Sequence, residues 1–439
     1  MKVIYPGRTN DDRGPDFRDA VIVTSAALLQ GDIELHAKAS DWRAHHHHLD
    51  AHYNRVILHV VHNVDKNSPT RLQNGKVVPT LALNNLTKYP HETVTGAPSS
   101  IVAPKTAHGN PCHYLNPNLL KPFLDKAGGN RFMSKTVKLQ NELESKDPGQ
   151  VLYQEMMRAL GYSKNQAPFL KLSLNLPLSK LEDLLKEKMT DTEHLARQQA
   201  LFFGGAGLLP SQHRERQDAT TPEDTWLQKL EKLWATCQTT ETIPPDEWNF
   251  FKLRPNNSPA RRLAGMSYLL LRYRRQGILK GIIESVKEAP PDTPHLNMQE
   301  AIQVATGGYW AYHINAGTGT RSAIPALIGN QRASEITVNV LLPFAFAWGR
   351  STRRPELTRK AQSIYSRHPR LPMNSLEKHM RLQWDINSYL INSAIRQQGL
   401  IHIYRTFCSQ GKCRDCPLIR SKAAVTYWAH GSARQRPRK

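Results

Sequence analysis

Long apolar runs are missing from this chain of 439 residues, and cysteine is scarce. The longest apolar stretches are cut short by arginine or end after a few residues, so no segment is long enough to span a bilayer. Residues 1–10 lack the apolar segment of a secretory signal peptide. Five cysteines, three of them clustered late, do not make the disulfide framework of a secreted protein. We therefore expect a cytoplasmic protein with no membrane partner.

Acidic residues are also few relative to basic ones. The chain has 37 Asp and Glu against 59 Lys and Arg, which gives a net charge of +22 at pH 7 and a pI near 9.8. Such an excess favours a polyanionic partner, most simply a nucleic acid. The length and a hydrophobic content of 39% permit two or three folded domains.

The sequence predicts an α+β protein in four parts. Residues 1–105 form a small mixed-sheet domain, 106–130 a linker rich in Pro, Asn, Gly and Ser, 131–400 a mainly α-helical domain, and 401–439 a cysteine cluster with a basic tail. Within the helical part, residues 375–398 predict one long helix closed by Gly399. Residues 349–369 have no clear periodicity and are expected to be irregular.

Four strands are expected in the N-terminal part, over residues 20–24, 32–36, 55–61 and 77–83. Residues 42–53 between the second and third strands predict a short helix. Pro79 in the last strand indicates a sheet edge. In the second strand, alternation places Ile33 and Leu35 on one face of the sheet and Asp32, Glu34 and His36 on the other.

Acids and histidines flank these short apolar strands. Asp16 precedes the first strand, and Glu34 and His36 lie two residues apart on the next strand of the expected hairpin. Two carboxylates can hold Mg²⁺ or Mn²⁺. The metal lowers the pKa of a bound water molecule and stabilises the pentavalent phosphate of the reaction, and the third residue orients that water.

This arrangement resembles the core of the PD-(D/E)XK nucleases and implies a restriction-endonuclease-like fold. Asp16 and Glu34 would be metal ligands, and His36 the water-orienting base or a third ligand. The chain departs from the pattern because His36 stands where those nucleases carry lysine. Imidazole can ligate a metal or accept a proton near pH 7, but it lacks the fixed charge of lysine.

The histidines of this region permit a second kind of metal site. His36, His45, His47 and His59 could surround Zn²⁺ or Mn²⁺, with Asp16 or Asp41. Asp12, Asp41 and Trp42 are expected to support the site. The alternative is purely structural: Asp16 caps a turn, Glu34 faces solvent and His59 is a hydrogen-bonded core residue.

Three late cysteines suggest another metal centre. Cys408, Cys413 and Cys416 follow His402, and the four side chains could close on Zn²⁺. An iron–sulfur cluster that uses Cys112 or Cys237 is the second possibility, and reduced thiols without a metal are the third.

Two basic segments could hold a nucleic-acid backbone. The first contains Arg350, Arg353, Arg354, Arg359 and Lys360. The second is the tail after Cys416, in which Tyr427 and Trp428 lie between basic residues, although a disordered tail is an equal alternative. We therefore expect a metal-dependent nuclease acting on DNA or RNA. The alternatives are a nucleic-acid-binding protein with a degenerate nuclease core and a zinc-dependent hydrolase of small substrates.

Several longer strings resemble an uncharacterised bacterial family, the domain-of-unknown-function family 2851. The resemblance spans nearly the whole chain and implies a common fold, without an assigned activity. The strings are Gly7-Arg8-x-Asn10, Gly14-Pro15-Asp16-Phe17, Gly31-Asp32-Ile33-Glu34-Leu35-His36, Ser40-Asp41-Trp42, His45-x-His47, Leu58-His59-Val60-Val61, Gly204-Gly205-Ala206-Gly207-Leu208-Leu209, Arg254-Pro255-x-Asn257-x-Pro259-x-x-Arg262-Leu263-Ala264, and Gly399-Leu400-Ile401 through Cys416-Pro417.

The same resemblance implies a further helical segment before Val3. In nucleases of this class the first helix often bears a Glu that assists the metal site. Here Met1 lies almost at Gly7. Either a truncated gene product or a start placed late would account for the difference.

Overall fold

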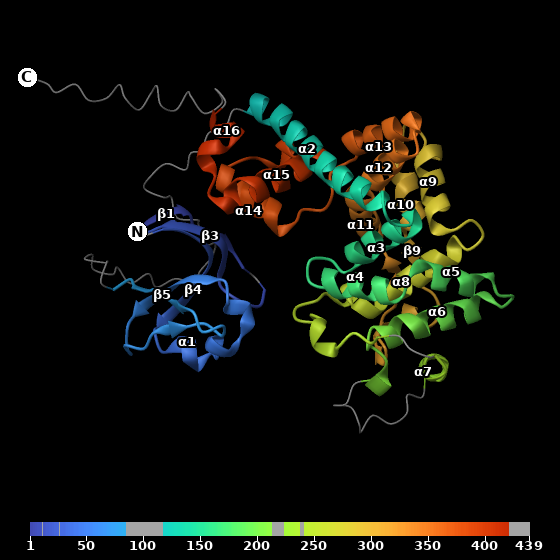
Figure 1. Cartoon of the computed structure of the whole chain (residues 1–439), viewed down its shortest axis with the longest axis horizontal. Helices are drawn as coiled ribbons and strands as arrows, with labels where there is room; N and C mark the ends of the chain where they lie inside the picture. The colour runs from blue at the N-terminus through green and yellow to red at the C-terminus, as the bar shows by residue number, and fades with distance from the viewer. Residues whose placement is uncertain (11, 26, 85–116, 213–223, 238–240, 421–439) are drawn as a thin grey trace, which may run out of the picture. The chain divides into compact units, whose positions relative to one another are not determined.

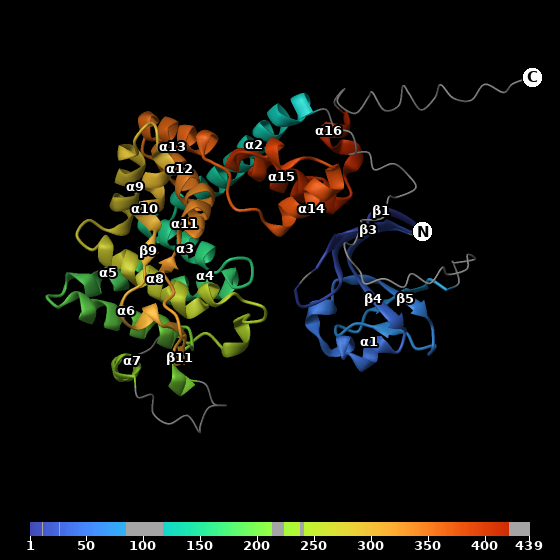
Figure 2. The ribbon, with the colours of Figure 1, turned by 180° about the vertical axis from the view of Figure 1, so that it is seen from behind.

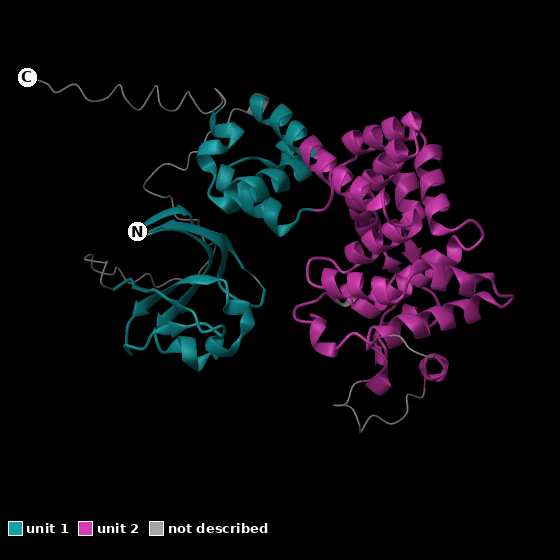
Figure 3. Cartoon of the chain, in the orientation of Figure 1, with its two compact units in different colours: residues 1–128, 373–392, 396–439 teal, residues 129–372, 393–395 magenta. Residues whose placement is uncertain are grey.

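The computed structural model describes residues 1–10, 12–25, 27–84, 117–212, 224–237 and 241–420. The chain divides into two compact units (Figure 3). Unit 1 contains residues 1–128, 373–392 and 396–439, and unit 2 contains residues 129–372 and 393–395. The chain therefore leaves unit 1 after residue 128 and returns at residue 373, apart from a brief second excursion at residues 393–395.

A six-stranded mixed sheet forms the N-terminal part of unit 1 (Figure 1). Its strands lie in the order β1-β3-β4-β5-β8, and β2 pairs with β3. The β1–β3, β2–β3 and β3–β4 pairs are antiparallel, whereas β4–β5 and β5–β8 are parallel. The strands are β1 (Lys2–Tyr5), β2 (Arg8–Thr9), β3 (Phe17–Val23), β4 (Leu28–Lys38), β5 (Val56–Asn63) and β8 (Thr80–Ala82).

The parallel pair β4–β5 needs a crossover, and the segment between the two strands supplies it. This segment contains the short helix α1 (Asp41–Ala44) and two 3₁₀ turns, η1 (His47–Leu49) and η2 (Ala51–Tyr53). A separate two-stranded pair, β6 (Thr70–Arg71) with β7 (Val77–Val78), precedes β8. The strands predicted over residues 20–24, 32–36 and 55–61 correspond to β3, β4 and β5, whereas the segment 77–83 is divided at Pro79 into β7 and β8. The short helix predicted over residues 42–53 consists of α1 and the two 3₁₀ turns. β8 lies at one end of the strand order, in agreement with a sheet edge.

The two faces of β4 differ in a way that alternation alone does not reveal. Asp32 is 3% exposed and Glu34 is 5% exposed, whereas the side chain of Leu35 is 42% exposed. Acidic residues are seldom buried without a partner. We therefore expect the buried carboxylates on this face of β4 to have hydrogen-bond donors, cations or a metal ion as partners.

Helices that lie far apart in the sequence complete unit 1. They are the first part of α2 (Pro117–Leu143), α14 (Ser375–Trp384), α15 (Ala394–Thr406) and α16 (Pro417–Arg420). Tyr5 of β1 and Val21 of β3 share one apolar core with Leu124, Trp384 and Leu400 of these helices. The described part of this core therefore joins the two ends of the chain.

Unit 2 is mainly helical and has its own core, in which Phe203, Leu263, Trp310 and Phe344 are buried. Figure 2 shows the same elements from behind. Within the described residues, no helix is both long and apolar enough for a membrane span. The helices are α3 (Pro148–Leu160), α4 (Gln166–Asn175), α5 (Leu178–Lys186), α6 (Asp191–Gly205), α7 (Thr225–Ala235), α8 (Pro259–Arg272), α9 (Ile278–Glu288), α10 (Pro294–Ile302), α11 (Asn330–Ile336), α12 (Leu342–Ser351) and α13 (Pro355–Arg367), and the short strands are β9 (Val304–Ala305), β10 (His313–Asn315), β11 (Thr318–Gly319) and β12 (Ala326–Ile328).

The predicted domain boundaries differ from these units. The expected linker 106–130 overlaps α2, which begins at Pro117, and the final part of the expected helical domain 131–400 belongs to unit 1. The described part of the predicted tail, residues 401–420, belongs to unit 1 as well. The difference arises because long-range packing, which local composition does not encode, assigns α14 and α15 to the sheet.

Two predictions about helices were wrong. Residues 375–398 form two helices instead of one, because Asp385 adopts a left-handed conformation (φ 51°) that ends α14. Gly399 lies inside α15, where a Cβ atom would come within 2.2 Å of the Leu124 carbonyl oxygen. It therefore allows α15 to approach α2 closely instead of ending a helix. Residues 349–369, expected to be irregular, lie largely in α12 and α13.

Candidate metal centre

The β3–β4 hairpin brings Asp16 beside Glu34. The Asp16 N–H donates a 2.9 Å hydrogen bond to Glu34 Oε2, and the Asp16 carboxylate accepts a 3.0 Å hydrogen bond from the Leu35 N–H. Asn10 holds the preceding loop, because its side chain donates to the Pro15 carbonyl at 2.8 Å. These bonds fix one oxygen of Glu34 and leave Oε1 for other partners.

Three histidines gather next to Glu34. One ring nitrogen from each of His36, His45 and His47 lies within 4.8 Å of the other two. His36 Nε2 is 3.2 Å from His45 Nδ1. Glu34 Oε1 lies 3.3 Å from His47 Nε2 and 3.6 Å from His36 Nε2. Among the described residues, these histidines form a group with the spacing of metal ligands, and we call it the histidine triad.

A backbone turn at His46 orients the two triad members on either side of it, His45 and His47. His46 has a left-handed conformation (φ 60°) between α1 and η1, so the chain reverses between His45 and His47. The His47 ring then stacks on Tyr53, with ring centroids 3.9 Å apart. Trp42, which is 2% exposed, packs against His47 with centroids 5.4 Å apart. Aromatic packing by Tyr53 and Trp42 therefore positions His47.

His59 lies behind the triad. Its Nε2 atom is 2.9 Å from His36 Nδ1, and its Nδ1 atom is 2.9 Å from Thr70 Oγ1. Both ring nitrogens therefore have partners within the protein. The structure places His59 as a hydrogen-bonded core residue next to a triad member. No sequence pattern pointed to Thr70.

Burial shapes the electrostatics of this region. Desolvation raises the pKa of the Asp16 carboxyl, the adjacent Glu34 raises it further, and the Leu35 N–H opposes the rise. Desolvation lowers the pKa of His36, although Glu34 counteracts part of this effect. Burial, together with the nearby His36, lowers the pKa of His59 to about 4. The rings of His36 and His59 are therefore neutral near pH 7, the form in which imidazole can ligate a metal.

The donor atoms fit a divalent metal of the zinc type. Zn–N bonds of about 2.0–2.1 Å in a tetrahedral site place neighbouring ligand atoms about 3.4 Å apart. The 3.2 Å separation between His36 Nε2 and His45 Nδ1 is close to that value, and a ring nitrogen of His47 belongs to the same group within 4.8 Å. Glu34 Oε1 lies beside this group without belonging to it. Imidazole ligands suit Zn²⁺, whereas Mg²⁺ and Mn²⁺ prefer oxygen ligands, such as the carboxylate of Glu34.

The other acids near the hairpin have structural partners. Asp41 Oδ2 accepts a hydrogen bond from the Lys38 N–H at 3.0 Å, and the Asp12 N–H is bonded to the Asn10 side chain at 3.2 Å. Asp32 accepts a 3.0 Å hydrogen bond from the Asp19 N–H. Among the residues that the structure describes, no acid, Asp16 and Glu34 included, belongs to the triad's group of ligand atoms within 4.8 Å.

The late cysteines are not brought together in the same way. Cys408 and Cys416 are buried in the core of unit 1, and desolvation raises the pKa of the Cys413 and Cys416 thiols. Over the described ranges, these cysteines and His402 do not form a group with ligand atoms within 4.8 Å of one another. The second metal centre stays a prediction, and Cys112 and residues 421–439 lie outside the described residues.

The first predicted basic segment lies at the turn between α12 and α13, which are side by side in Figures 1 and 2. Arg350, Arg353, Arg354 and Arg359 are exposed. Lys360 is half-buried and donates to the Ala289 carbonyl oxygen at 2.6 Å, so it helps to hold unit 2 together. Four of the five predicted cations are therefore accessible to a polyanion.

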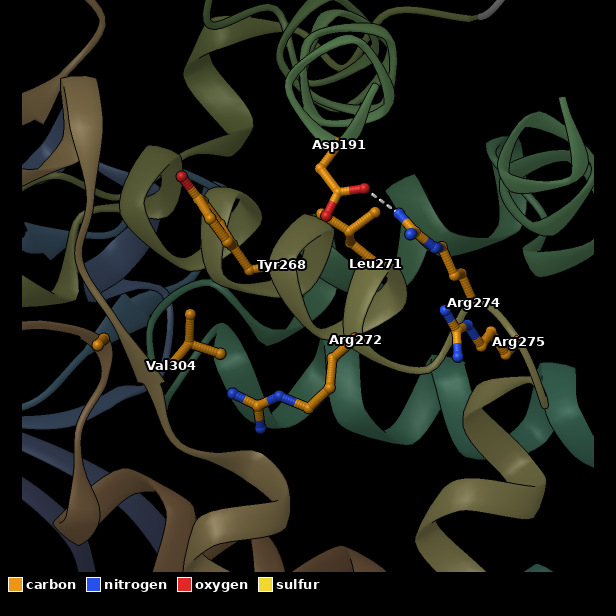
Figure 4. A pocket seen from close by; sticks show the side chains of 8 residues that line it. Asp191, Tyr268, Leu271, Arg272, Arg274, Arg275 and Val304 are labelled. Atoms are coloured by element: carbon orange, nitrogen blue, oxygen red, sulfur yellow. Dashed lines mark hydrogen bonds and ion pairs between the residues drawn. The ribbon is translucent and has the colours of Figure 1, made fainter. Parts of the chain in front are cut away.

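Unit 2 also contains a hollow of about 590 Å³ that the sequence did not indicate (Figure 4). Arg274 pairs with Asp191 in this hollow, and Arg272 donates to backbone carbonyl oxygens such as that of Gln303, at 2.7 Å. Two of its arginines are thus already engaged in structural bonds. The lining residues are Asp191, Tyr268, Leu271, Arg272, Arg274, Arg275, Val304 and Ala305.

The sheet and the histidine triad define a protein with a mixed α+β architecture and a candidate metal centre on its N-terminal sheet. The chain belongs to the family described as "Protein of unknown function (DUF2851)", whose model matches residues 1–370. No curated protein matches the chain, and no solved structure does.

Proposed function

We propose that this protein is a metal-dependent phosphodiesterase acting on DNA or RNA, with its centre at the histidine triad. The observation that carries the proposal is the convergence of His36, His45 and His47 beside the buried carboxylate of Glu34. Three histidine ligands leave one coordination position open, as in catalytic zinc sites. A bound metal ion would supply a Lewis acid that lowers the pKa of water and stabilises phosphate charge.

The residues divide into three roles. The triad binds the ion. Glu34 accepts a proton at Oε1, because Oε2 is already held by the Asp16 N–H. Asp16, which is exposed, keeps the hairpin in register through its bond to Leu35. These roles revise the nuclease-core hypothesis, in which Asp16 and Glu34 held Mg²⁺ or Mn²⁺ and His36 was the water-orienting base or a third ligand. They keep His36, His45 and His47 from the alternative histidine site and leave out His59.

Two features support a nucleic-acid substrate. The net charge of +22 and the exposed arginines at the α12–α13 turn favour a polyanion. The antiparallel β3–β4 hairpin, followed by a helical crossover to the parallel strand β5, resembles the strand arrangement of restriction-endonuclease-like cores. A hydrolase of small neutral substrates would have no use for this charge.

The decisive experiment incubates purified full-length protein with plasmid, linear duplex, single-stranded DNA and RNA, each with Zn²⁺, Mn²⁺ or Mg²⁺. We expect cleavage with Zn²⁺ or Mn²⁺ and a loss of about 100-fold or more in a Glu34→Gln variant, since general-base catalysis typically contributes 10²–10⁴-fold. Absence of cleavage with every metal, together with salt-sensitive binding, would instead favour the second candidate, a nucleic-acid-binding protein. The exposed arginines favour that candidate, and so does His36 in place of lysine.

A further inference from the structure

A chain of hydrogen bonds runs from the histidine triad into the sheet. His36 Nδ1 is 2.9 Å from His59 Nε2, and His59 Nδ1 is 2.9 Å from Thr70 Oγ1. Thr70 Oγ1 is in turn 2.9 Å from Thr80 Oγ1. Three side chains from β5, β6 and β8 therefore follow His36 in one line.

The sheet fixes each member of this chain. Parallel pairing places His59 opposite Thr80, and the His59 N–H donates a 3.0 Å hydrogen bond to the Pro79 carbonyl oxygen. His59 is completely buried and Thr70 is 3% exposed. Neither side chain can exchange its partner for a water molecule, so this chain of hydrogen bonds is part of the folded core.

The chain constrains the proton positions on His36. A neutral imidazole carries one N–H and one lone pair. For His36 to offer its Nε2 lone pair to a metal, Nδ1 must carry the proton and donate to His59 Nε2. His59 Nδ1 then donates to Thr70, and the Thr70 hydroxyl donates to Thr80. Every donor meets an acceptor in this direction.

We infer that His59, Thr70 and Thr80 form a positioning chain that holds His36 with Nε2 directed at the metal, and that His59 is not itself a ligand. This inference rests on the proposed metal site and adds residues that set its affinity. Partners of this kind, which bond the other nitrogen of a metal-ligating histidine, typically change metal affinity by 10–100-fold.

The test measures Zn²⁺ affinity of the full-length protein by competition with a chromophoric chelator. Thr70→Val keeps the shape of the side chain but removes the hydroxyl, and we expect it to weaken Zn²⁺ binding by about 10–100-fold. Thr70→Ser restores the hydroxyl and should bind like the wild type. Thr24→Val is the matched control, because it removes a hydroxyl bonded at 3.1 Å to the Ala27 carbonyl oxygen, in a turn of unit 1 away from the triad.

The outcomes separate this inference from the proposed function. A wild-type protein that binds no Zn²⁺ would overturn the metal site and the positioning chain together. If the wild type binds Zn²⁺ tightly and Thr70→Val binds it with the same affinity, the positioning chain alone would be overturned. If Thr70→Val does not fold, Thr80→Val replaces it, because Thr80 is exposed. We expect Thr80→Val to lower the Zn²⁺ affinity by about threefold to tenfold. A Zn²⁺ affinity within twofold of that of the wild type would overturn the inference.

Discussion

Glu34 Oε1 lies 3.3 Å from His47 Nε2, although the two residues belong to different elements, β4 and η1. The contact joins the buried middle of β4 to the crossover segment and places a carboxylate beside a ring of the histidine triad. It also suggests that the two residues have separable roles, since Glu34 is held from behind by Asp16.

Substitution of His47 and of Glu34 should therefore give different results. His47→Ala removes a ligand, and we expect about a 100-fold or greater loss of Zn²⁺ affinity together with the loss of cleavage. Glu34→Gln should keep Zn²⁺ affinity within about threefold of the wild type while cleavage falls by about 100-fold or more. His46→Asn is the control, because asparagine tolerates the left-handed backbone there. Equal loss of Zn²⁺ binding in both variants would contradict the assigned roles.

The backbone of His46 should make position 46 sensitive to residue shape. A left-handed conformation costs an L-residue roughly 1–2 kcal/mol, and a β-branched side chain makes it worse. We expect His46→Val to lower the free energy of unfolding by about 1–2 kcal/mol, whereas His46→Gly should leave it unchanged or raise it. Urea denaturation of the metal-free protein measures the difference, and equal stability of the two variants would argue against the turn.

His379 of α14 should make stability depend on pH. It shares a hydrogen bond with Tyr5 and packs against Tyr404, and burial together with the nearby Arg8 lowers its pKa to about 4. In the unfolded chain the pKa is near 6.5, so the unfolded state binds more protons between pH 6.5 and 4. The stabilisation is complete above pH 6.5 and decreases as the pH falls to 4, by on the order of 3 kcal/mol.

A His379→Gln variant isolates this contribution. Other histidines, such as His59, titrate in the same window, so the wild type and the variant will both lose stability at low pH. The variant should lose less, and its free energy of unfolding should have a smaller slope against pH between 6.5 and 4. Chemical denaturation at five pH values provides the measurement, and parallel curves for the two proteins would contradict the prediction.

The exposed arginines at the α12–α13 turn should control the salt dependence of nucleic-acid binding. Each lost phosphate contact lowers the slope of log K against log salt by about 0.9 for duplex DNA. We expect an Arg350→Ala/Arg354→Ala/Arg359→Ala variant to lower the slope by about 1–3. Fluorescence anisotropy with a labelled duplex measures it. A Lys180→Ala/Lys186→Ala/Lys188→Ala variant of unit 2, which also removes three exposed positive charges, is the charge-matched control, and an equal effect of the two variants would indicate nonspecific attraction.

Much of the N-terminal sheet could be predicted from the sequence. β-Branched runs marked β3 and β5, and alternation placed Glu34 and His36 on one face of β4. The pattern did not reveal that both faces of β4 are partly covered, with Ile33 buried and Leu35 exposed on one face and Asp32 and Glu34 buried on the other. Alternation defines two faces of a strand, and only the packing of other elements decides which one is covered.

The arrangement of the site was harder to predict. The convergence of His45 and His47 depends on the left-handed turn at His46, for which the sequence has no glycine or asparagine as a signal. Thr70 lies in a strand of two residues, too short for a periodic pattern. The sequence did not predict which segments make up unit 1, for a different reason. Residues far apart in the sequence, such as Val21 and Leu400, share its core.

The division of unit 1 into separate segments has a consequence for the synthesis of the protein. Tyr5 and Val21 are complete in the nascent chain long before Trp384 and Leu400, their core partners, have been translated. At 5–20 residues per second, translation of residues 129–372 takes about 10–50 s. For that time only the first part of α2, with Leu124, is available to cover this apolar face of the sheet. We therefore expect the nascent chain to depend on chaperones until its final helices emerge.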